Sequence, residues 1–279
     1  MIVAKKTVES YLTKSKIGQF AINPYVGCPH ACKYCYASFM KRFTGHSEPW
    51  GDFIDIKQSK RKINAAQIKD KNVFMGTVTD CYNPYEAKYG ITRSILEQLV
   101  GVDCYLQIAT KNKLILRDLD LLKRMRRLSV ALSVNTLDEN FRRDMDRAST
   151  VQERLKTLRT LHENGIYTIL FMSPIFVGIT DWKAIIETSR SFISEYWFED
   201  LNLRGGYKAV ILQYVREHYP DHYPRFERIY VKGDKTPLTE MENEIIVYCR
   251  DNDILFSDYF HHDEAIRNPK NKILGNNKP

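Results

Sequence analysis

The sequence has no long apolar run: nowhere in its 279 residues do about 18 apolar residues follow one another, the length that a membrane-spanning helix needs. We therefore expect no membrane partner. The segment MIVAKKTVESYLTK, 1–14, also lacks a basic stretch followed by an apolar one. It does not predict a secretory signal, and we expect a cytoplasmic protein.

Cysteine is scarce, with six residues in the chain. Thiols stay reduced in the cytoplasm, so grouped cysteines there are more often metal ligands or catalytic groups than disulfides. Three of the six fall within eight residues, in the stretch CPHACKYCYA, 28–37. The other three are scattered and are compatible with small core residues: Cys81, Cys104 and Cys249.

Basic residues outnumber acidic ones by 42 to 34, which gives a net charge of +8. Such a surplus attracts polyanions without selecting among them, so nucleic acid is one partner class that it allows. The densest basic runs are KQSKRK, 57–62, and KRMRR, 123–127. We interpret both mainly as solvated surface, because basic residues also favour the last turn of a helix.

From about residue 72, short apolar runs alternate with amphipathic stretches. The periodicity predicts helices over 91–100, 114–125, 149–165 and 179–193. It predicts strands over 19–27, 73–79, 104–110, 128–135, 166–176 and 198–204. Ser149 is the expected N-cap of the third helix, and Gly165 follows its C-terminus. About six β-α units predict an α/β fold with a parallel sheet, open or closed into a partial barrel.

The alternation fades after about residue 207. We therefore divide the chain into an N-terminal extension, a barrel domain, a mainly helical C-terminal extension and a polar tail, over 1–18, 19–207, 208–266 and 267–279. Helices are expected over 208–218 and 240–251. The tail, RNPKNKILGNNKP, is expected to be disordered.

Two expected strands are fully apolar on one face only. In LSVALSVN, 128–135, leucine and valine alternate with smaller or polar residues that end in Ser133 and Asn135. In CYLQIATK, 104–111, the corresponding face ends in Lys111. A parallel strand covered by helices on both sides is apolar on both faces. The alternation therefore predicts a barrel lumen that holds a polar ligand, with its site at the C-terminal ends of the strands.

Cys28, Cys32 and Cys35 have the spacing C-x3-C-x2-C and follow the first expected strand. Thiolates bind zinc, copper(I) and iron–sulfur clusters. A closed zinc site needs a fourth protein ligand, and His30, inside so short a loop, is poorly placed to supply it. A 4Fe–4S cube held by three cysteines leaves one iron for another ligand. We favour the cube, with a zinc-stabilised binding module as the alternative.

With Tyr34 before the third cysteine, the loop resembles the signature of radical S-adenosylmethionine (SAM) enzymes. Over roughly residues 20–205, five segments follow the order seen in the spore photoproduct lyase group of DNA repair photolyase-like enzymes: NPYVGCPHACKYCYA, TVTDCYNPYEAKYGITR, ATKNKLILRDLDLL, LSVNTLDENFRRDMDRAS and MSPIFVGITD. The resemblance implies a partial (β/α)6 barrel and a 4Fe–4S cluster whose free iron binds SAM. Reductive cleavage of SAM would yield a 5′-deoxyadenosyl radical that abstracts hydrogen from a substrate.

The resemblance also implies residue roles. The cluster ligands would be Cys28, Cys32 and Cys35, and Tyr34 would pack beside the adenine. An external one-electron reductant of the flavodoxin or ferredoxin type would be a partner.

Residues at the predicted strand ends would bind SAM. The resemblance assigns the methionyl amino group to Thr79 and Asp80, and the carboxylate to Lys111. Ser133 and Asn135 would bond the ribose or the carboxylate. An ordinary strand-end hydroxyl for Thr79 and a solvated lysine for Lys111 are the alternatives.

The sequence departs from spore photoproduct lyase at its hydrogen-donating cysteine, where Thr77 stands. Cys81, four residues on, is a candidate substitute. Tyr34 and Tyr36 match tyrosines linked to radical quenching, and we count them as candidate catalytic residues. A convincing match to the DNA-wedging hairpin of the lyase is missing, so we do not identify the chain as the lyase itself.

Two substrate classes stay open. Nucleic acid is supported by the basic surplus and by tyrosines on expected loops that could stack bases: Tyr82, Tyr85, Tyr89, Tyr219 and Tyr223. A peptide or a small metabolite is the alternative. Since Cys249 alone lies in the C-terminal extension, the sequence argues against a peptide-modifying enzyme with auxiliary clusters.

Overall fold

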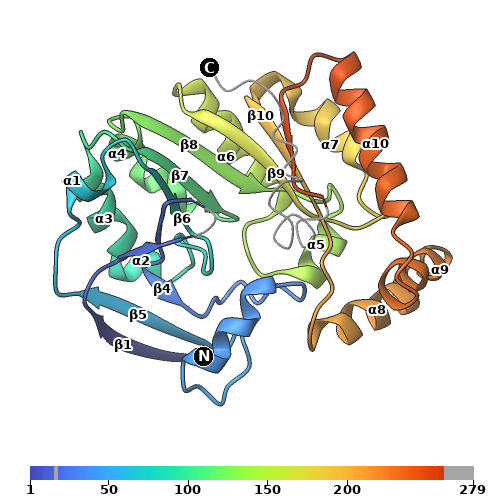
Figure 1. The fold of residues 1–279 in the computed structure, drawn as a ribbon, viewed down its shortest axis with the longest axis horizontal. Coiled ribbons are helices and arrows are strands. Elements are labelled where there is room, and N and C mark those ends of the chain that lie inside the picture. Colours follow the sequence, from blue (N-terminus) through green and yellow to red (C-terminus); the bar gives the residue numbers. More distant parts are fainter. Residues whose placement is uncertain (16–17, 261–279) are drawn as a thin grey trace.

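The structure, a computed structural model, describes residues 1–15 and 18–260, and within them an eight-stranded sheet has the order β11-β10-β9-β8-β7-β6-β3-β2 (Figure 1). The strands from β3 to β10 in this sheet pair in parallel, while β2 pairs antiparallel with β3. The bounds are β2 Leu12–Lys14, β3 Phe20–Ile22, β6 Asn72–Met75, β7 Tyr105–Thr110, β8 Arg127–Ser133, β9 Tyr167–Ile175, β10 Glu195–Asp200 and β11 Phe256–Asp258. Six consecutive parallel strands confirm the expected partial (β/α)6 barrel.

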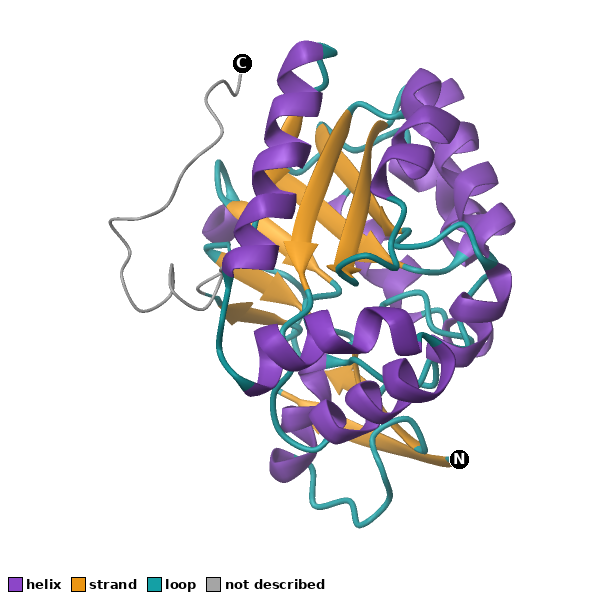
Figure 2. Cartoon of the chain, turned by 90° about the vertical axis from the view of Figure 1, so that its right-hand side faces the viewer, coloured by secondary structure: helices purple, strands orange, loops and turns teal. Residues whose placement is uncertain are grey.

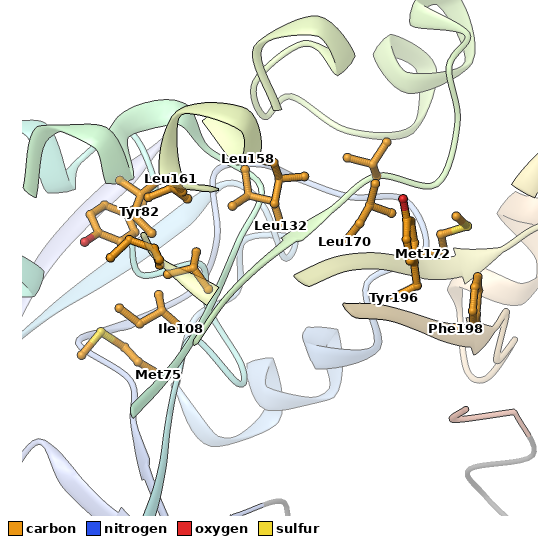
Figure 3. Packing of buried hydrophobic residues seen from close by; sticks show 14 of the residues in the cluster. Met75, Tyr82, Ile108, Leu132, Leu158, Leu161, Leu170, Met172, Tyr196 and Phe198 are labelled. Atoms are coloured by element: carbon orange, nitrogen blue, oxygen red, sulfur yellow. The ribbon is translucent and has the colours of Figure 1, made fainter. Parts of the chain in front are cut away.

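Helices cover the outer face of this sheet, and Figure 2 shows the strands surrounded by them. Those that follow successive strands are α3 Ile91–Leu99, η2 Lys113–Asp118, α4 Leu119–Leu122, α6 Val151–Glu163, α7 Trp182–Ser189, η3 Arg190–Phe192 and α10 Thr236–Asp251. Their apolar residues and the outward residues of the strands form the main core. Figure 3 shows this packing where Leu158 of α6 lies beside Leu132 and Leu170.

The two faces of the strands differ, as their sequences predict. Leu106, Ile108 and Leu132 belong to the core between sheet and helices. Ala109 and Ala131, from the opposite parity, belong to a separate cluster on the inner face, which we call the lumen. The predicted alternation is therefore confirmed, and the lumen-facing residues of β7 and β8 are small or polar.

Two helix predictions were wrong in detail. The N-cap of α6 is Thr150, which forms a capping box with Glu153, whereas the Ser149 hydroxyl accepts a hydrogen bond from Lys113 N. The helix expected over 114–125 is a 3-10 turn followed by the short α4. The break comes at Asp118, whose fully buried carboxylate is turned toward Arg93.

A second sheet was not predicted. Its order is β1-β5-β4, with bounds β1 Ile2–Val8, β4 Tyr25–Val26 and β5 Phe53–Ser59. The strand expected over 19–27 therefore divides between the two sheets. The start of β5 is buried, although its sequence, FIDIKQS, shows no clean alternation and runs into a basic stretch.

The remaining elements are short turns and the C-terminal helices. Their bounds are η1 Tyr36–Phe43, α1 Ala65–Ile68, α2 Glu86–Tyr89, α5 Glu139–Met145, α8 Tyr207–His218, η4 Pro220–His222, α9 Tyr223–Phe226 and η5 Glu227–Val231. The C-terminal segment also returns to the main sheet, because β11 pairs in parallel with β10. The tail expected over 267–279 lies outside the described residues. Among those described, we find no helix with the length and apolarity required to traverse a bilayer.

Candidate active site

The cysteine loop follows β4 and packs tightly against the turn before β5. Gly27 has a φ of +83°, and a Cβ there would lie 2.3 Å from Phe53 O. Gly51, with a φ of +110°, approaches Ala31 so closely that a Cβ would lie 2.8 Å from that of the alanine. Only glycine meets both demands, so these two positions define the path of the loop.

The three cysteines are free thiols, with Cys28 buried and Cys32 and Cys35 half-buried. Burial raises the pKa of each thiol, and the negative charge of Cys35 adds to the rise at Cys28 and Cys32. The thiols are therefore close enough to act on one another. Within residues 1–15 and 18–260, no group of three or more His, Cys, Asp or Glu side chains is arranged so that it could hold a single metal ion.

Asp80 connects this loop to the end of β7. Its Oδ2 accepts from Lys111 N at 2.8 Å and lies 3.1 Å from His30 Nε2. Its Oδ1 accepts from Tyr82 N at 2.8 Å and from the Thr110 hydroxyl at 2.7 Å. Asp80 thus joins the cysteine loop to the end of β7, and both of its oxygens accept hydrogen bonds within the fold. The resemblance instead assigned it to the methionyl amino group.

Near Asp80, two buried polar atoms have no hydrogen-bond partner within the described part of the chain: Thr79 Oγ1 and His30 Nδ1. An unpaired buried polar atom costs free energy unless a ligand or water satisfies it. Thr79 is therefore free to bond a ligand, as the resemblance implies.

Lys111 lies at the centre of the site. Its Nζ donates to the Tyr34 hydroxyl at 3.2 Å and is 5.2 Å from the centre of that ring. It forms no ion pair with any of the described residues, and its charge lowers the pKa of Cys32 and Cys35. A half-buried ammonium group near the cysteines is suited to bind an anionic ligand group.

Behind Tyr34 lies an ion pair that the sequence did not indicate. The Tyr34 hydroxyl donates to Asp146 Oδ2 at 3.3 Å, and Arg154 Nη2 donates to Asp146 Oδ1 at 2.5 Å. Arg154 also donates to Ser133 O at 3.2 Å. Burial opposes ionisation of Asp146, yet the charges of Arg154 and Lys111 hold its pKa below the ordinary value. The pair therefore joins the cysteine loop to the end of β8.

The other lumen candidates differ in position. Ser133 ends β8, half-buried, on the lumen face. Asn135 is buried, and its Nδ2 donates to Pro174 O at 3.0 Å, which ties β8 to β9. Tyr36 is 54% exposed, and its hydroxyl donates to Thr77 O.

Cys81 and the tyrosines expected to stack bases lie elsewhere. Cys81 is fully buried in the core between sheet and helices, so the structure does not bring it together with the other candidates. The five tyrosines are all buried or half-buried. Tyr82 and Tyr85 belong to hydrophobic clusters, and Tyr219 packs against another aromatic ring. Tyr82 is fully buried, whereas the other four keep part of their surface exposed, and base stacking by them stays a prediction.

The lumen also contains an acidic group that the sequence analysis missed. Glu199, near the end of β10, accepts a hydrogen bond from the Ser173 hydroxyl of β9. Burial raises its pKa to about 7, although the bond from Ser173 and the charge of Lys111 oppose the rise. The alternation in FEDLNLR could have indicated Glu199, but the predicted strand began too late to include the whole of β10.

Residues 22–188 match the family described as Radical SAM superfamily. An uncharacterized protein of Methanocaldococcus jannaschii is 34% identical over 255 residues, 91% of this chain and 93% of the relative. An uncharacterized protein of Mycobacterium tuberculosis is 24% identical over 241 residues, 80% of this chain and 71% of the relative.

Solved structures show a similar fold. Spore photoproduct lyase complexed with dinucleoside spore photoproduct superposes with a TM-score of 0.54 at 17% identity, covering 78% of this chain and 66% of the lyase. A lyase structure with bound AdoMet and the same ligand has a TM-score of 0.55. The match thus spans slightly less than two thirds of the lyase, and at this identity it shows the fold alone.

Proposed function

Because the chain belongs to the radical SAM superfamily, we propose that it is an enzyme with a 4Fe–4S cluster held by Cys28, Cys32 and Cys35. With SAM bound to the open iron, the cluster would supply the electron that yields a 5′-deoxyadenosyl radical, which abstracts hydrogen from a substrate. The observation that carries this proposal is the C-x3-C-x2-C loop at the end of the barrel where Thr79 and Lys111 also lie.

The donor set fits an iron–sulfur cluster. Burial raises the pKa of these thiols, and a bound metal would offset that rise by favouring the thiolate, the ligand that such clusters take. Three cysteines without a fourth protein ligand leave the coordination that SAM requires. His30 is engaged with Asp80, and this contact supports its role as a structural residue of the loop.

For SAM, the described residues offer complementary groups. The free Thr79 hydroxyl can bond the methionyl amino group, and the Lys111 ammonium can pair with the carboxylate. Ser133, with its backbone oxygen held by Arg154, can bond the ribose. Asp80 supports this site from behind by holding Lys111 N and Thr110 in place. For Asn135, which the resemblance assigned to the ribose or the carboxylate, the bond to Pro174 O favours a role in orienting the adjoining strand ends.

Among the candidate hydrogen donors, Tyr36 has the most exposed side chain, although its hydroxyl donates to Thr77 O. Tyr36 follows Cys35 directly in the chain, and the negative charge of Glu199 in the lumen acts on it. Tyr34 is buried and bonded to Asp146 and Lys111, so it is better suited to position Lys111 than to meet a substrate. Cys81 is sealed in the core.

We propose nucleic acid as the substrate class, with a small metabolite or peptide as the alternative. The net charge of +8 favours a polyanion, and the lyase with a similar fold is described as binding a dinucleoside. An external reductant of the flavodoxin or ferredoxin type would supply the electron, and a cytoplasmic location would keep the thiols reduced.

The test is anaerobic reconstitution with iron and sulfide, followed by iron analysis and mass spectrometry of products formed from SAM and dithionite. We expect about four irons per chain, a brown protein and 5′-deoxyadenosine. A colourless protein with one zinc, or a Cys32→Ala variant that still forms 5′-deoxyadenosine, would contradict the proposal. Product assays against DNA, RNA and small-molecule pools then identify the substrate class.

A further inference from the structure

The lumen face of β10 carries two glutamates that differ in their surroundings. Glu195, at the start of the strand, accepts from Trp197 Nε1 at 2.8 Å and from the Ser257 hydroxyl at 2.6 Å. Glu199, at the C-terminal end, bonds the Ser173 hydroxyl and forms no ion pair within residues 1–15 and 18–260. Glu195 is therefore used by the fold, and Glu199 retains capacity to accept from a ligand.

Aromatic side chains form the adjoining wall of the lumen. Phe171 of β9 and Trp197 of β10 are register partners whose rings meet edge to face at 5.5 Å. Tyr259 packs against both, at 6.3 Å from Phe171 and 5.4 Å from Trp197. Its backbone N–H donates to Phe198 O at 2.8 Å, which fixes the ring beside the strand. Trp197 is buried, whereas Phe171 and Tyr259 are half-buried, so this cluster forms an apolar wall of rings set at steep angles to one another, next to Glu199 along the strands.

Three side chains on the lumen face at this end keep some contact with solvent. Phe171, Ser173 and Glu199 are half-buried, while their outward neighbours in β9 and β10 are buried. The charges of Lys111 and Asp200 act on Glu199, and the charge of Glu199 acts in turn on Tyr36 and Tyr259. Glu199 thus faces the same space as the candidate SAM residues, and a substrate there would meet both.

A carboxyl group above an aromatic surface suits two kinds of ligand, a cation and a flat heterocycle with N–H groups. The Lys111 ammonium in the same lumen disfavours a second cation. Near neutral pH, the raised pKa also leaves Glu199 partly protonated, so it can donate as well as accept. The edge of a nucleobase presents donors and acceptors side by side, and enzymes that act on a base commonly hold it by such edge contacts and by stacking.

We propose that Glu199, positioned by Ser173, reads the hydrogen-bonding edge of a nucleobase that enters the lumen and lies against the aromatic wall of Phe171, Trp197 and Tyr259. This inference rests on the proposed nucleic-acid substrate and names the group that recognises it. Glu199 is a substrate-binding residue, and Ser173 is a positioning residue that orients its carboxyl group.

The test compares two fluorescent single-stranded DNA probes of equal length and charge, one of mixed sequence and one made of abasic units. Binding to the anaerobically reconstituted, SAM-loaded protein is measured by anisotropy at about 50 mM salt. The wild type should prefer the base-containing probe by about tenfold or more, the factor that one good base contact supplies. Glu199→Leu, which removes both the donor and the acceptor, should reduce this preference to below about threefold, and Ser173→Ala should reduce it in part.

The control for the lost negative charge is Glu195→Gln, on the same face of the same strand but bonded within the fold, which should keep the preference. Equal binding of the two probes by the wild type, or a Glu199→Leu variant that retains the preference, overturns the inference. So does a raised dissociation constant for SAM in that variant, because Glu199 would then belong to the cofactor site. If the wild type cleaves SAM but binds neither probe, the nucleic-acid substrate fails while the radical chemistry stands.

Discussion

Replacing Asp80 by asparagine separates a structural role from a cofactor contact. Four donors converge on its carboxylate, two on each oxygen: Tyr82 N and the Thr110 hydroxyl on Oδ1, and Lys111 N and His30 Nε2 on Oδ2. An asparagine keeps one oxygen and presents an NH2 group in place of the other. Whichever way the amide turns, one backbone N–H group, of Tyr82 or of Lys111, loses its acceptor and faces the new N–H group, because the Thr110 hydroxyl and the His30 ring nitrogen can also accept.

The expected loss of stability follows from burial. An unsatisfied buried donor costs about 1–3 kcal/mol, and each of the other hydrogen bonds loses the carboxylate charge that strengthens it. We expect the free energy of unfolding to fall by about 3–5 kcal/mol, which lowers the melting temperature by roughly 6–20 °C in a protein of this size. Burial opposes ionisation of Asp80, but His30 and the hydrogen bonds hold its pKa below the ordinary value. This stabilisation is therefore present above the unfolded-state pKa and is lost as the pH falls through the lowered folded-state pKa.

The assay is an anaerobic thermal melt of wild type and Asp80→Asn, together with their dissociation constants for SAM. Asp120→Asn is a matched control, because Asp120 pairs with Arg93 on the surface and contributes little when exposed. A melting temperature unchanged in Asp80→Asn, with SAM affinity lost instead, would refute the structural interpretation. It would show that Asp80 contacts the methionyl group directly, as the sequence resemblance implies.

Three further outcomes are expected. Cys32→Ala should lose the iron and the brown colour of the anaerobic protein, whereas Cys249→Ala, in the core, should keep both; iron retained in the first variant would exclude Cys32 as a ligand. Because burial raises the pKa of Glu199 from 4.5 to about 7, the folded protein binds a proton that the unfolded chain releases in this range, so stability falls as the pH rises through it. Glu199→Gln should flatten that slope in melts recorded against pH, and an unchanged slope would mean that another group titrates. Thr150→Ala should cost about 1 kcal/mol in a thermal melt through loss of the capping box with Glu153, and no loss would reassign the N-cap.

The C-terminal segment illustrates how tertiary pairing changes an interpretation. The sequence after residue 207 suggested helices beyond the barrel, and α8 and α10 are present. The segment Phe256–Asp258 nevertheless pairs with β10 as strand β11 and brings Tyr259 to the lumen wall. Three residues, of which only Phe256 is apolar, do not specify a partner, and the open edge of the main sheet supplied one.

Local sequence was sufficient for the features that depend on spacing alone. The C-x3-C-x2-C loop, the six β-α units and the alternating faces of β7 and β8 follow from intervals of a few residues, which the backbone geometry converts directly into faces and loops. The placement of Lys111 and Ser133 toward the lumen follows from the same alternation.

Tertiary structure decided which of these groups meet and what they do. His30 and Asp80 are 50 positions apart in the chain, and Ser173 and Glu199 are 26 apart, so no local pattern couples them. Cys81 lies in the core, whereas its neighbour Asp80 accepts a hydrogen bond from Lys111 N at the end of β7. Both positions depend on how the segment after β6 packs against β7. The physical reason is that spacing determines which way a side chain points, whereas its contacts depend on which distant strand is packed beside it.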